Sequence, residues 1–251
     1  ISSGLVGSEM CIRDSFNAYG EINDTSGIDT LYRNIYDPST FTGVVFKESL
    51  EKYGARVKTI SKKKTSNKSY KKVSNHLSKP LIHSATNLMN ESDNLSAELF
   101  VKSIGALDTL PGTWKVGLDS IKSFLAKEVL IDTSNIRLAD ASGVSRYNLT
   151  SAAQLNSLLK WMYASEYKDD FISTLPGGGW ENSTLEKRLI DEGDLVKAKT
   201  GGLSGVRNLA GYIKSKKYGD VAFSILMNGY TDYSSRYARV HDQIVKSIIY
   251  D

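Results

Sequence analysis

AKTGGLSGVRNLAGYI, residues 198–213, is the stretch that decides the fold. Its apolar residues and those nearby predict three strands, at residues 195–199, 207–214 and 221–227. A charged turn around Gly219 joins the second and third strands. The first strand enters an antiparallel hairpin, so an antiparallel sheet is expected in the last quarter of the chain.

Helical periodicity marks most of the remaining chain. The predicted helices cover residues 37–53, two segments between 81 and 104 that meet at a polar junction at 90–94, and then 114–125, 152–163 and 233–249. A short strand is predicted at 136–139. A helical middle followed by antiparallel strands and a closing helix predicts an α+β layered domain.

Composition narrows the possible functions. With 251 residues, 40% hydrophobic and 24% charged, the chain is long enough for one well-buried domain. The formal charge of +4 is too small to indicate nucleic acid, and no apolar run is long enough to span a membrane. His76, His83 and His241 are too far apart for ligand spacing, so neither a metal nor another cofactor is expected.

The first fifteen residues do not resemble the start of a protein. They lack an initiating Met and a signal pattern, and GSEMCIRDS resembles a translated sequencing adapter of the kind found in metagenomic assemblies. Residues 1–15 are therefore interpreted as non-native. They contain Cys11, the single cysteine, and a cysteine-free remainder fits an oxidising envelope compartment without disulfides.

Two short motifs carry the chemical signal: SDN at Ser92-Asp93-Asn94 and KTG at Lys199-Thr200-Gly201. Each tripeptide alone is weak evidence, because either arises often by chance. In this order, with SDN at a helix junction and KTG on a strand, they match the motif set of penicillin-binding proteins and serine β-lactamases.

Longer segments make the resemblance more specific: NESDNLSAELF (90–100), GTWKVGLDSIKSFL (112–125), LADASGVSRYNLTS (138–151) and AKTGGLSGVRNLAGYI (198–213). They resemble the peptidase family S13 D-alanyl-D-alanine carboxypeptidases, the class C low-molecular-mass penicillin-binding proteins. The resemblance implies a serine β-lactamase/transpeptidase-like α+β fold, an antiparallel sheet flanked by helices, incomplete at the N-terminus. Residues 16–36 would end the family's insertion, and 37–251 would form the C-terminal part of the catalytic domain.

The resemblance also implies roles for three polar side chains. Ser92 would relay a proton between the lysine of an SxxK motif and the leaving nitrogen. The Asn94 amide would fix the substrate backbone and that lysine, and Lys199 would supply positive potential. The SxxK serine, the nucleophile, would lie upstream of residue 1.

The substrate would lie along the KTG strand. Thr200 would bind the substrate carboxylate, Gly201 would leave room, and the N–H of Gly202 would be an oxyanion donor. The family pattern has Thr at position 202, so one possible hydroxyl contact to the carboxylate is lost in this chain. A pocket for the peptidoglycan side chain would be lined by Val144, Arg146, Leu203 and Ser204. Alternatively, Arg146 pairs with a nearby carboxylate, and Leu203 and Val144 belong to the core.

SxxK spacing also occurs inside the chain, at Ser49/Lys52, Ser61/Lys64, Ser69/Lys72, Ser157/Lys160 and Ser165/Lys168. An active serine needs the start of a buried helix, with its lysine desolvated one turn later. These serines are predicted inside helices, in a basic run or at a polar helix end. We therefore interpret all five pairs as coincidental.

The expected function is a serine-type D-Ala-D-Ala carboxypeptidase/endopeptidase that acts on peptidoglycan stem peptides through an acyl-serine and binds β-lactams. This chain is expected to be inactive alone, and the parent protein to reach the periplasm or another extracytoplasmic site through an upstream signal peptide. One alternative is a serine β-lactamase or esterase. Another is a non-catalytic wall-binding module that uses the lysine-rich residues 58–72.

Overall fold

The computed structural model describes residues 4–10, 16–21, 35–63 and 72–251. These residues form two compact units, Ile1–Asn75 and His76–Asp251. The predictions for Cys11, for much of the 16–36 segment and for the lysine-rich residues 64–71 lie outside the described residues. The two units are described separately below.

The described residues of the first unit form a strand pair and one helix. Strand β1 (Gly4–Met10) pairs antiparallel with β2 (Phe16–Glu21), which the sequence did not predict because this region has little apolar alternation. Helix α1 (Pro38–Lys52) confirms the predicted first helix. The Asp37 side chain accepts a hydrogen bond from the Thr40 N–H at 3.2 Å and forms an ion pair with Lys62, so it caps the helix.

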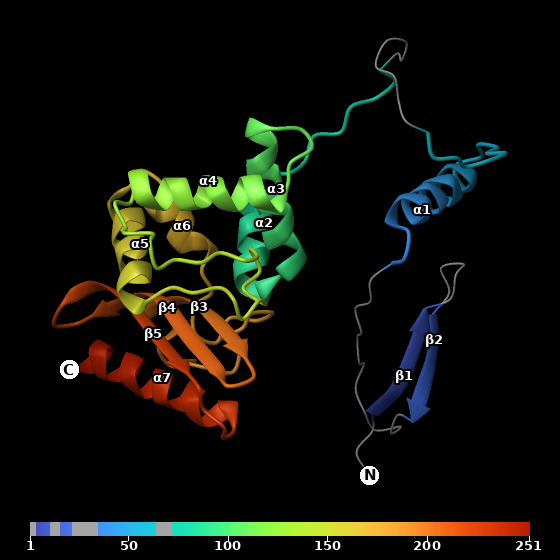
Figure 1. Cartoon of the computed structure of the whole chain (residues 1–251). Coiled ribbons are helices and arrows are strands. Elements are labelled where there is room, and N and C mark those ends of the chain that lie inside the picture. The colour runs from blue at the N-terminus through green and yellow to red at the C-terminus, as the bar shows by residue number, and fades with distance from the viewer. Residues whose placement is uncertain (1–3, 11–15, 22–34, 64–71) are drawn as a thin grey trace. The chain divides into compact units, whose positions relative to one another are not determined.

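The second unit is built around a three-stranded antiparallel sheet in the order β3-β4-β5 (Figure 1). Strands β3 (Val196–Leu203), β4 (Val206–Ser215) and β5 (Gly219–Asn228) confirm the three predicted strands and extend them, and a 3-10 turn, η2 (Gly193–Leu195), precedes β3. The sheet is tight at Gly211, where a Cβ would lie 2.0 Å from the Lys197 carbonyl oxygen. Only glycine fits this position.

One face of the sheet is covered by the closing helix α7 (Ser234–Tyr250), which confirms the predicted terminal helix. Side chains alternate along a strand, so Leu209 and Ile213 of β4 point to the same face. They form one core with Val245 and Ile249 of α7. All four are at most 1% exposed, so this face of the sheet is closed.

The opposite face carries Tyr212 and meets helices α5 (Ala152–Ala164) and α6 (Lys168–Thr174). The Tyr212 hydroxyl donates to the Leu159 carbonyl at 2.7 Å, which ties the sheet to α5. Helix α5 was predicted, and a complete capping box from Ser151 and Gln154 begins it. Helix α6 was not predicted, because seven residues are too few to show a helical period.

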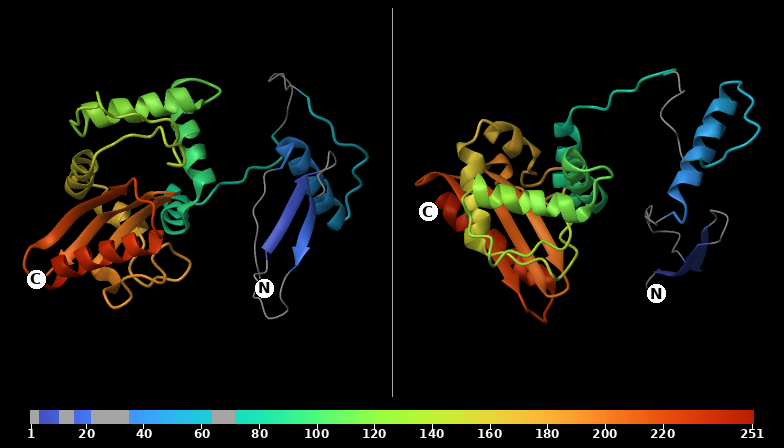
Figure 2. Two further views of the ribbon diagram at one scale, coloured as in Figure 1. Left: turned by 60° about the horizontal axis from the view of Figure 1, so that its bottom comes forward. Right: turned by 45° about the horizontal axis from the view of Figure 1, so that its top comes forward.

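A second group of helices lies beside the sheet: α2 (Leu81–Asn87), the π-helix η1 (Leu88–Ser92), α3 (Asn94–Asp108) and α4 (Trp114–Lys127) (Figure 2). They confirm the predicted helices and the polar junction between them. Helices α3 and α4 pack closely because Gly117 faces α3, where a Cβ would lie 2.0 Å from the Val101 carbonyl oxygen.

The predicted strand at 136–139 is wrong. Residues Arg137 and Leu149 form only an isolated bridge, and the segment otherwise runs as a loop. Ile136 is buried in a small cluster with Val129 and Ile131 instead of joining the sheet. The apolar residues of this segment are therefore explained by packing against helices and not by pairing in a sheet.

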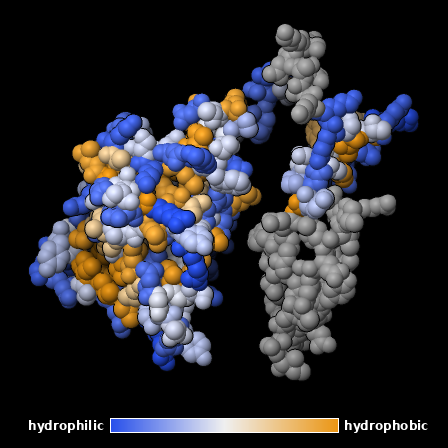
Figure 3. Space-filling model, in the orientation of Figure 1, coloured by the Kyte–Doolittle hydropathy of each residue, from blue (hydrophilic) through white to orange (hydrophobic). Residues whose placement is uncertain are grey.

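On the surface of the molecule, apolar side chains form patches between hydrophilic ones (Figure 3).

Candidate active site

Ser92 stands at a sharp turn in the backbone. It ends the π-helix η1 and has φ of 60°, a left-handed conformation that is costly for a residue other than glycine. Asp93 then begins α3, and its carboxylate accepts hydrogen bonds from the N–H groups of Leu95 and Ser96, both at 3.1 Å. This helix cap fixes the turn and holds the exposed Ser92 side chain outside both helices.

Lys199 joins the two sequence motifs. Its ammonium donates to the Ser92 hydroxyl at 2.7 Å, across 107 residues of sequence, and to the Thr200 carbonyl at 2.8 Å. No carboxylate pairs with Lys199 among the described residues. Burial lowers its pKa from 10.5 to about 8, because desolvation disfavours the charged form. The pair is a hydroxyl held against a weakly solvated cation.

Strand β3 has a partly open edge. The N–H of Ala198 points away from β4 and donates to the Pro176 carbonyl at 3.1 Å, where the segment before Gly177 covers the edge. Backbone hydrogen-bonding groups alternate along a strand, so those of Thr200 and Gly202 point to the same edge as Ala198. No other strand pairs with that edge among the described residues. It is available to an added extended chain.

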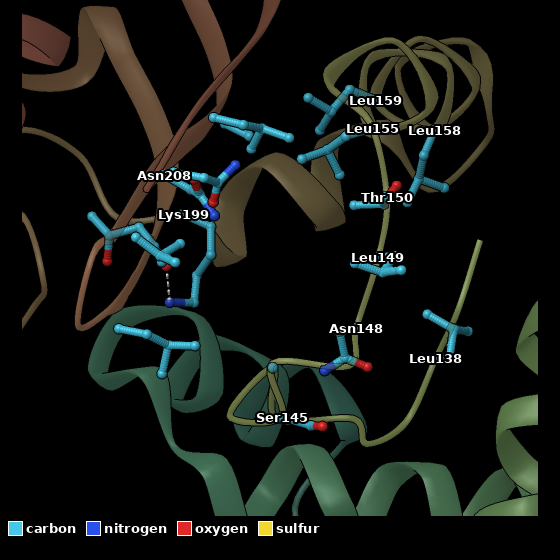
Figure 4. A pocket seen from close by; sticks show the side chains of 18 of the residues that line it. Leu138, Ser145, Asn148, Leu149, Thr150, Leu155, Leu158, Leu159, Lys199 and Asn208 are labelled. Atoms are coloured by element: carbon cyan, nitrogen blue, oxygen red, sulfur yellow. Dashed lines mark hydrogen bonds between the residues drawn. The ribbon is translucent and has the colours of Figure 1, made fainter. Parts of the chain in front are cut away.

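A pocket of about 820 Å³ opens next to Lys199. The strand wall of the pocket includes Lys199 and Asn208, and the opposite wall is the apolar side of α5, with Leu155, Leu158 and Leu159 (Figure 4). The lining is mostly apolar, with the KTG strand along one border. The polar Ser92–Lys199 pair therefore adjoins a large apolar cavity.

The rim of the pocket is formed by a loop from Ala139 to Asn148. Asp140 organises this loop by accepting hydrogen bonds from the N–H groups of Gly143 at 2.8 Å and Ser145 at 2.6 Å. The Glu98 carboxylate of α3 accepts from the Ser142 N–H at 2.9 Å. The helix that begins at the SDN motif thus also holds the rim loop.

Arg146 extends from this loop to the β3–β4 hairpin. Its guanidinium donates to the Ser204 carbonyl oxygen at 2.7 Å, so the arginine pairs with a backbone oxygen rather than with a carboxylate. Arg146 also lines the pocket, together with Leu203 and the neighbouring Gly143. Val144 is 52% exposed on the same loop.

The structure brings most of the predicted site residues together. Ser92 and Lys199 are in contact, and the pocket is lined by Lys199, Thr200, Gly201, Leu203 and Arg146. Asn94 is the exposed first residue of α3, next to Asp93, and Gly202 follows on the open strand. Their binding and chemical roles stay predictions.

Sequence reasoning missed three polar residues near the site. Glu98 and Asp140 organise the rim, and Asn208 lines the pocket while accepting from the Met227 N–H at 3.2 Å. Asp140 sits in the pattern DASG, and an Asp two or three residues before a glycine is typical of a side-chain-stabilised turn. That signal was available in the sequence.

The internal SxxK pairs that the structure describes do not line the pocket. Ser157 lies within α5 and donates to the Ala153 carbonyl, whereas Ser165 caps the C-terminal end of that helix. Ser49 lies within α1 and donates to the Val45 carbonyl. None of these three serines stands at the start of a buried helix.

Within the described ranges, no group of His, Cys, Asp and Glu side chains is arranged to hold a metal ion. Over the same residues, none of the helices has the length and apolar character that crossing a bilayer requires.

The antiparallel sheet with helices on both faces defines the fold class, which is similar to the folds of penicillin binding protein 4 and of a β-lactamase. The sequence model of the D-Ala-D-Ala carboxypeptidase 3 (S13) family matches residues 11–247. The chain belongs to this family of peptidases, as the sequence motifs predicted.

Individual relatives support the same family assignment. The chain is 32% identical to a D-alanyl-D-alanine carboxypeptidase of Actinomadura sp. (strain R39) over 212 residues, 80% of this chain and 39% of that protein. The crystal structure of penicillin binding protein 4 from Haemophilus influenzae with a β-lactam superposes with a TM-score of 0.80 at 24% identity, covering 99% of this chain and 59% of that one. The TLA-3 β-lactamase shares the fold at a TM-score of 0.50 and 21% identity, over 66% of this chain and 62% of that one.

Proposed function

We propose that the protein containing this chain is a serine-type D-Ala-D-Ala carboxypeptidase/endopeptidase that acts on peptidoglycan stem peptides through an acyl-serine intermediate. Membership of the S13 family supports the reaction class. The chain spans only 39% of its Actinomadura relative, so the activity is proposed for the whole protein. The same reaction would make it penicillin-binding and place it outside the cytoplasm, where the wall polymer lies.

The observation that carries this proposal is the 2.7 Å hydrogen bond from the Lys199 ammonium to the Ser92 hydroxyl. Two motifs that are 107 residues apart in the sequence therefore meet beside an open strand edge. Lys199 keeps the Ser92 hydroxyl oriented, so its lone pair accepts from the ammonium and its own proton is free to be passed on.

The roles proposed for the other groups are those that the family resemblance implies, and the open edge of β3 supports them. An extended peptide added to the open edge of β3 would place its terminal residues beside Thr200 and Gly202. The Thr200 hydroxyl would bind the carboxylate, and the N–H of Gly202 would stabilise the oxyanion. Ser92 would deliver a proton to the leaving nitrogen, and the exposed Asn94 amide would hold the peptide backbone.

We place the nucleophilic serine in a part of the protein outside these 251 residues. The internal SxxK serines described above do not border the pocket, which argues against them. The pocket itself supports an external source, because its wall of Leu155, Leu158 and Leu159 suits an apolar helix. A helix starting with SxxK and seated there would bring its serine close to Ser92 and Lys199.

Labelling with a fluorescent penicillin tests the proposal. The full-length protein should form one covalent adduct per molecule, whereas the 251-residue chain alone should form none. Ser92→Ala and Lys199→Ala should each slow acylation of the full-length protein by about 100- to 10,000-fold, since both remove a proton-transfer group or its support. Release of D-alanine from an acyl-D-Ala-D-Ala peptide, and cleavage of a cross-linked dimer, would separate the carboxypeptidase and endopeptidase activities.

Lys214→Ala is the matched control, because Lys214 is an exposed lysine on the neighbouring strand β4. It should leave the acylation rate unchanged. Stoichiometric labelling of the 251-residue chain would mean that the nucleophile lies within it. Failure of the full-length protein to react with penicillin would refute penicillin binding.

A further inference from the structure

Arg207 on β4 lies directly across from Gly202 on β3 in the antiparallel pairing. Opposed residues in such a pair share a face of the sheet, and residues two apart on one strand share it too. Thr200, Gly202 and Arg207 therefore stand on one face of the sheet, at the end of the strand that carries the KTG motif.

The guanidinium of Arg207 reaches the site of the missing Gly202 side chain. A Cβ placed on Gly202 would lie 3.2 Å from Nη1 of Arg207, closer than most side-chain contacts. Glycine at position 202 therefore leaves room in which the arginine head lies against the open strand.

Arg207 has no counter-charge among the described residues. It forms no ion pair there, and its Nε is buried without a hydrogen-bond partner. The nearby Asp242 is already held by Arg188, whose Nη2 donates to it at 2.7 Å. Burial and the Arg188 charge lower the pKa of Arg207, and the charges of Tyr230 and Asp242 oppose this effect only in part.

We propose that Arg207 is a specificity-determining residue that binds the free C-terminal carboxylate of the substrate, together with the Thr200 hydroxyl. Gly202 is also required, because its lack of a side chain gives the guanidinium access to the strand edge. This inference rests on the proposed function of the same site. It replaces the hydroxyl contact that is lost at position 202 with a charged one.

The chemistry of the two groups fits. A guanidinium presents paired N–H donors in a plane that matches a carboxylate, and such hydrogen bonds between charged groups are stronger than neutral ones. Lys199 lies on the opposite face of β3, so a carboxylate at the edge would be flanked by two cations. Arg207 would favour ligands with a free carboxylate over neutral analogues that are otherwise identical.

The test compares acylation of the full-length protein by a penicillin and by its methyl ester, which lacks the negative charge. Arg207→Gln removes the charge and leaves a shorter polar side chain that can still form hydrogen bonds. It should slow acylation by the penicillin about 10- to 100-fold and acylation by the ester less than about threefold. Arg207→Lys keeps the charge and should recover part of the preference for the free acid.

A second substitution tests the pairing with Gly202. In the Arg207→Gln background, Gly202→Thr adds a hydroxyl on the same face and should restore several-fold of the penicillin rate. In the wild-type background it should bring no gain, because the new side chain crowds the guanidinium. Lys214→Ala should change neither rate.

Equal losses with penicillin and ester in Arg207→Gln, with a reactive wild type, would show a merely structural role and overturn this inference alone. Unchanged rates with both ligands would overturn it as well. If the wild-type protein reacts with neither ligand, the proposed function fails, and this inference fails with it.

Discussion

On the α7 face of the β3–β4–β5 sheet, Leu209 and Ile213 are at most 1% exposed and touch a complete core. On the α5 face, a pocket of about 820 Å³ separates part of the same sheet from Leu155 and Leu158. Both faces carry apolar side chains from the same strands. The difference shows that apolar alternation alone does not close a face, because a covering element of the right size must also be present.

The Ser92–Lys199 pair lies at the border of the open face. The closed face supplies a rigid support for β3, and the open face supplies access to Lys199. Leu209 and Ile213 belong to a filled core, whereas Leu155 and Leu158 border the pocket, so substitutions at these two places should have different consequences.

Truncation of a leucine on each face gives the largest expected contrast. Leu209→Ala should lower the free energy of unfolding of the chain by about 3 kcal/mol, because it opens a cavity in a filled core. Leu155→Ala should lower it by about 1 kcal/mol or less, because this side chain already borders empty space. Denaturant unfolding measures both.

The same pair of variants in the full-length protein sharpens the comparison. If an SxxK helix fills the pocket, the loss for Leu155→Ala should rise towards that for Leu209→Ala. Equal losses in the 251-residue chain itself would mean that the two faces do not differ.

A buried histidine makes the closed face sensitive to acid. His241 is fully buried, and neither ring nitrogen has a partner among the described residues. Burial, with the charges of Arg188 and Arg207, lowers its pKa from 6.5 to about 4 despite the opposing effect of Asp242. Between pH 6.5 and pH 4 the histidine is protonated in the unfolded chain but neutral in the folded chain. The free energy of unfolding is therefore unaffected by this group above pH 6.5 and falls as the pH drops towards 4.

The expected loss at the acid end is about 2–3 kcal/mol. Unfolding at pH 7.5 and pH 4.5 measures it, and His241→Leu should show a clearly smaller difference between the two pH values. An unchanged pH dependence in that variant would assign the acid sensitivity to other groups.

On the open face, Lys199 should give a pH effect on rate. Its pKa of about 8 means that the ammonium is charged below pH 8 and progressively neutral above it. The second-order rate constant of penicillin acylation by the full-length protein should therefore fall about tenfold per pH unit above pH 8. This fall corresponds to a rise in the activation free energy of about 1.4 kcal/mol per pH unit. Lys199→Arg should move this alkaline limb above pH 10, whereas a wild-type profile that stays flat to pH 9.5 would contradict it.

The sequence predicted the sheet, the long helices and the meeting of SDN with KTG, because each depends on local periodicity or on a motif. It did not predict the isolated bridge at Arg137, since Ile136 owes its burial to distant helices. Nor did it predict the rim contacts of Glu98, which accepts N–H groups from a loop more than 40 residues away. Contacts of this kind depend on how elements pack, which periodicity does not record.

The position of Arg207 is a further example. Its sequence neighbours place it on a strand, but only the pairing register sets it opposite Gly202. The glycine and the arginine are individually unremarkable in the sequence. Their relation appears once the two strands are aligned.

The hydrogen bond from Ala198 to Pro176 limits how much of β3 is left unpaired. A long exposed strand edge invites the edge of a second molecule, and proteins often aggregate in this way. Here the first part of the edge is occupied by the chain itself, so within the part of the chain that the structure describes only the residues from Lys199 to Leu203 are open. A peptide of two or three residues can use so short an edge, whereas the sheet of another molecule gains too few hydrogen bonds to stay attached.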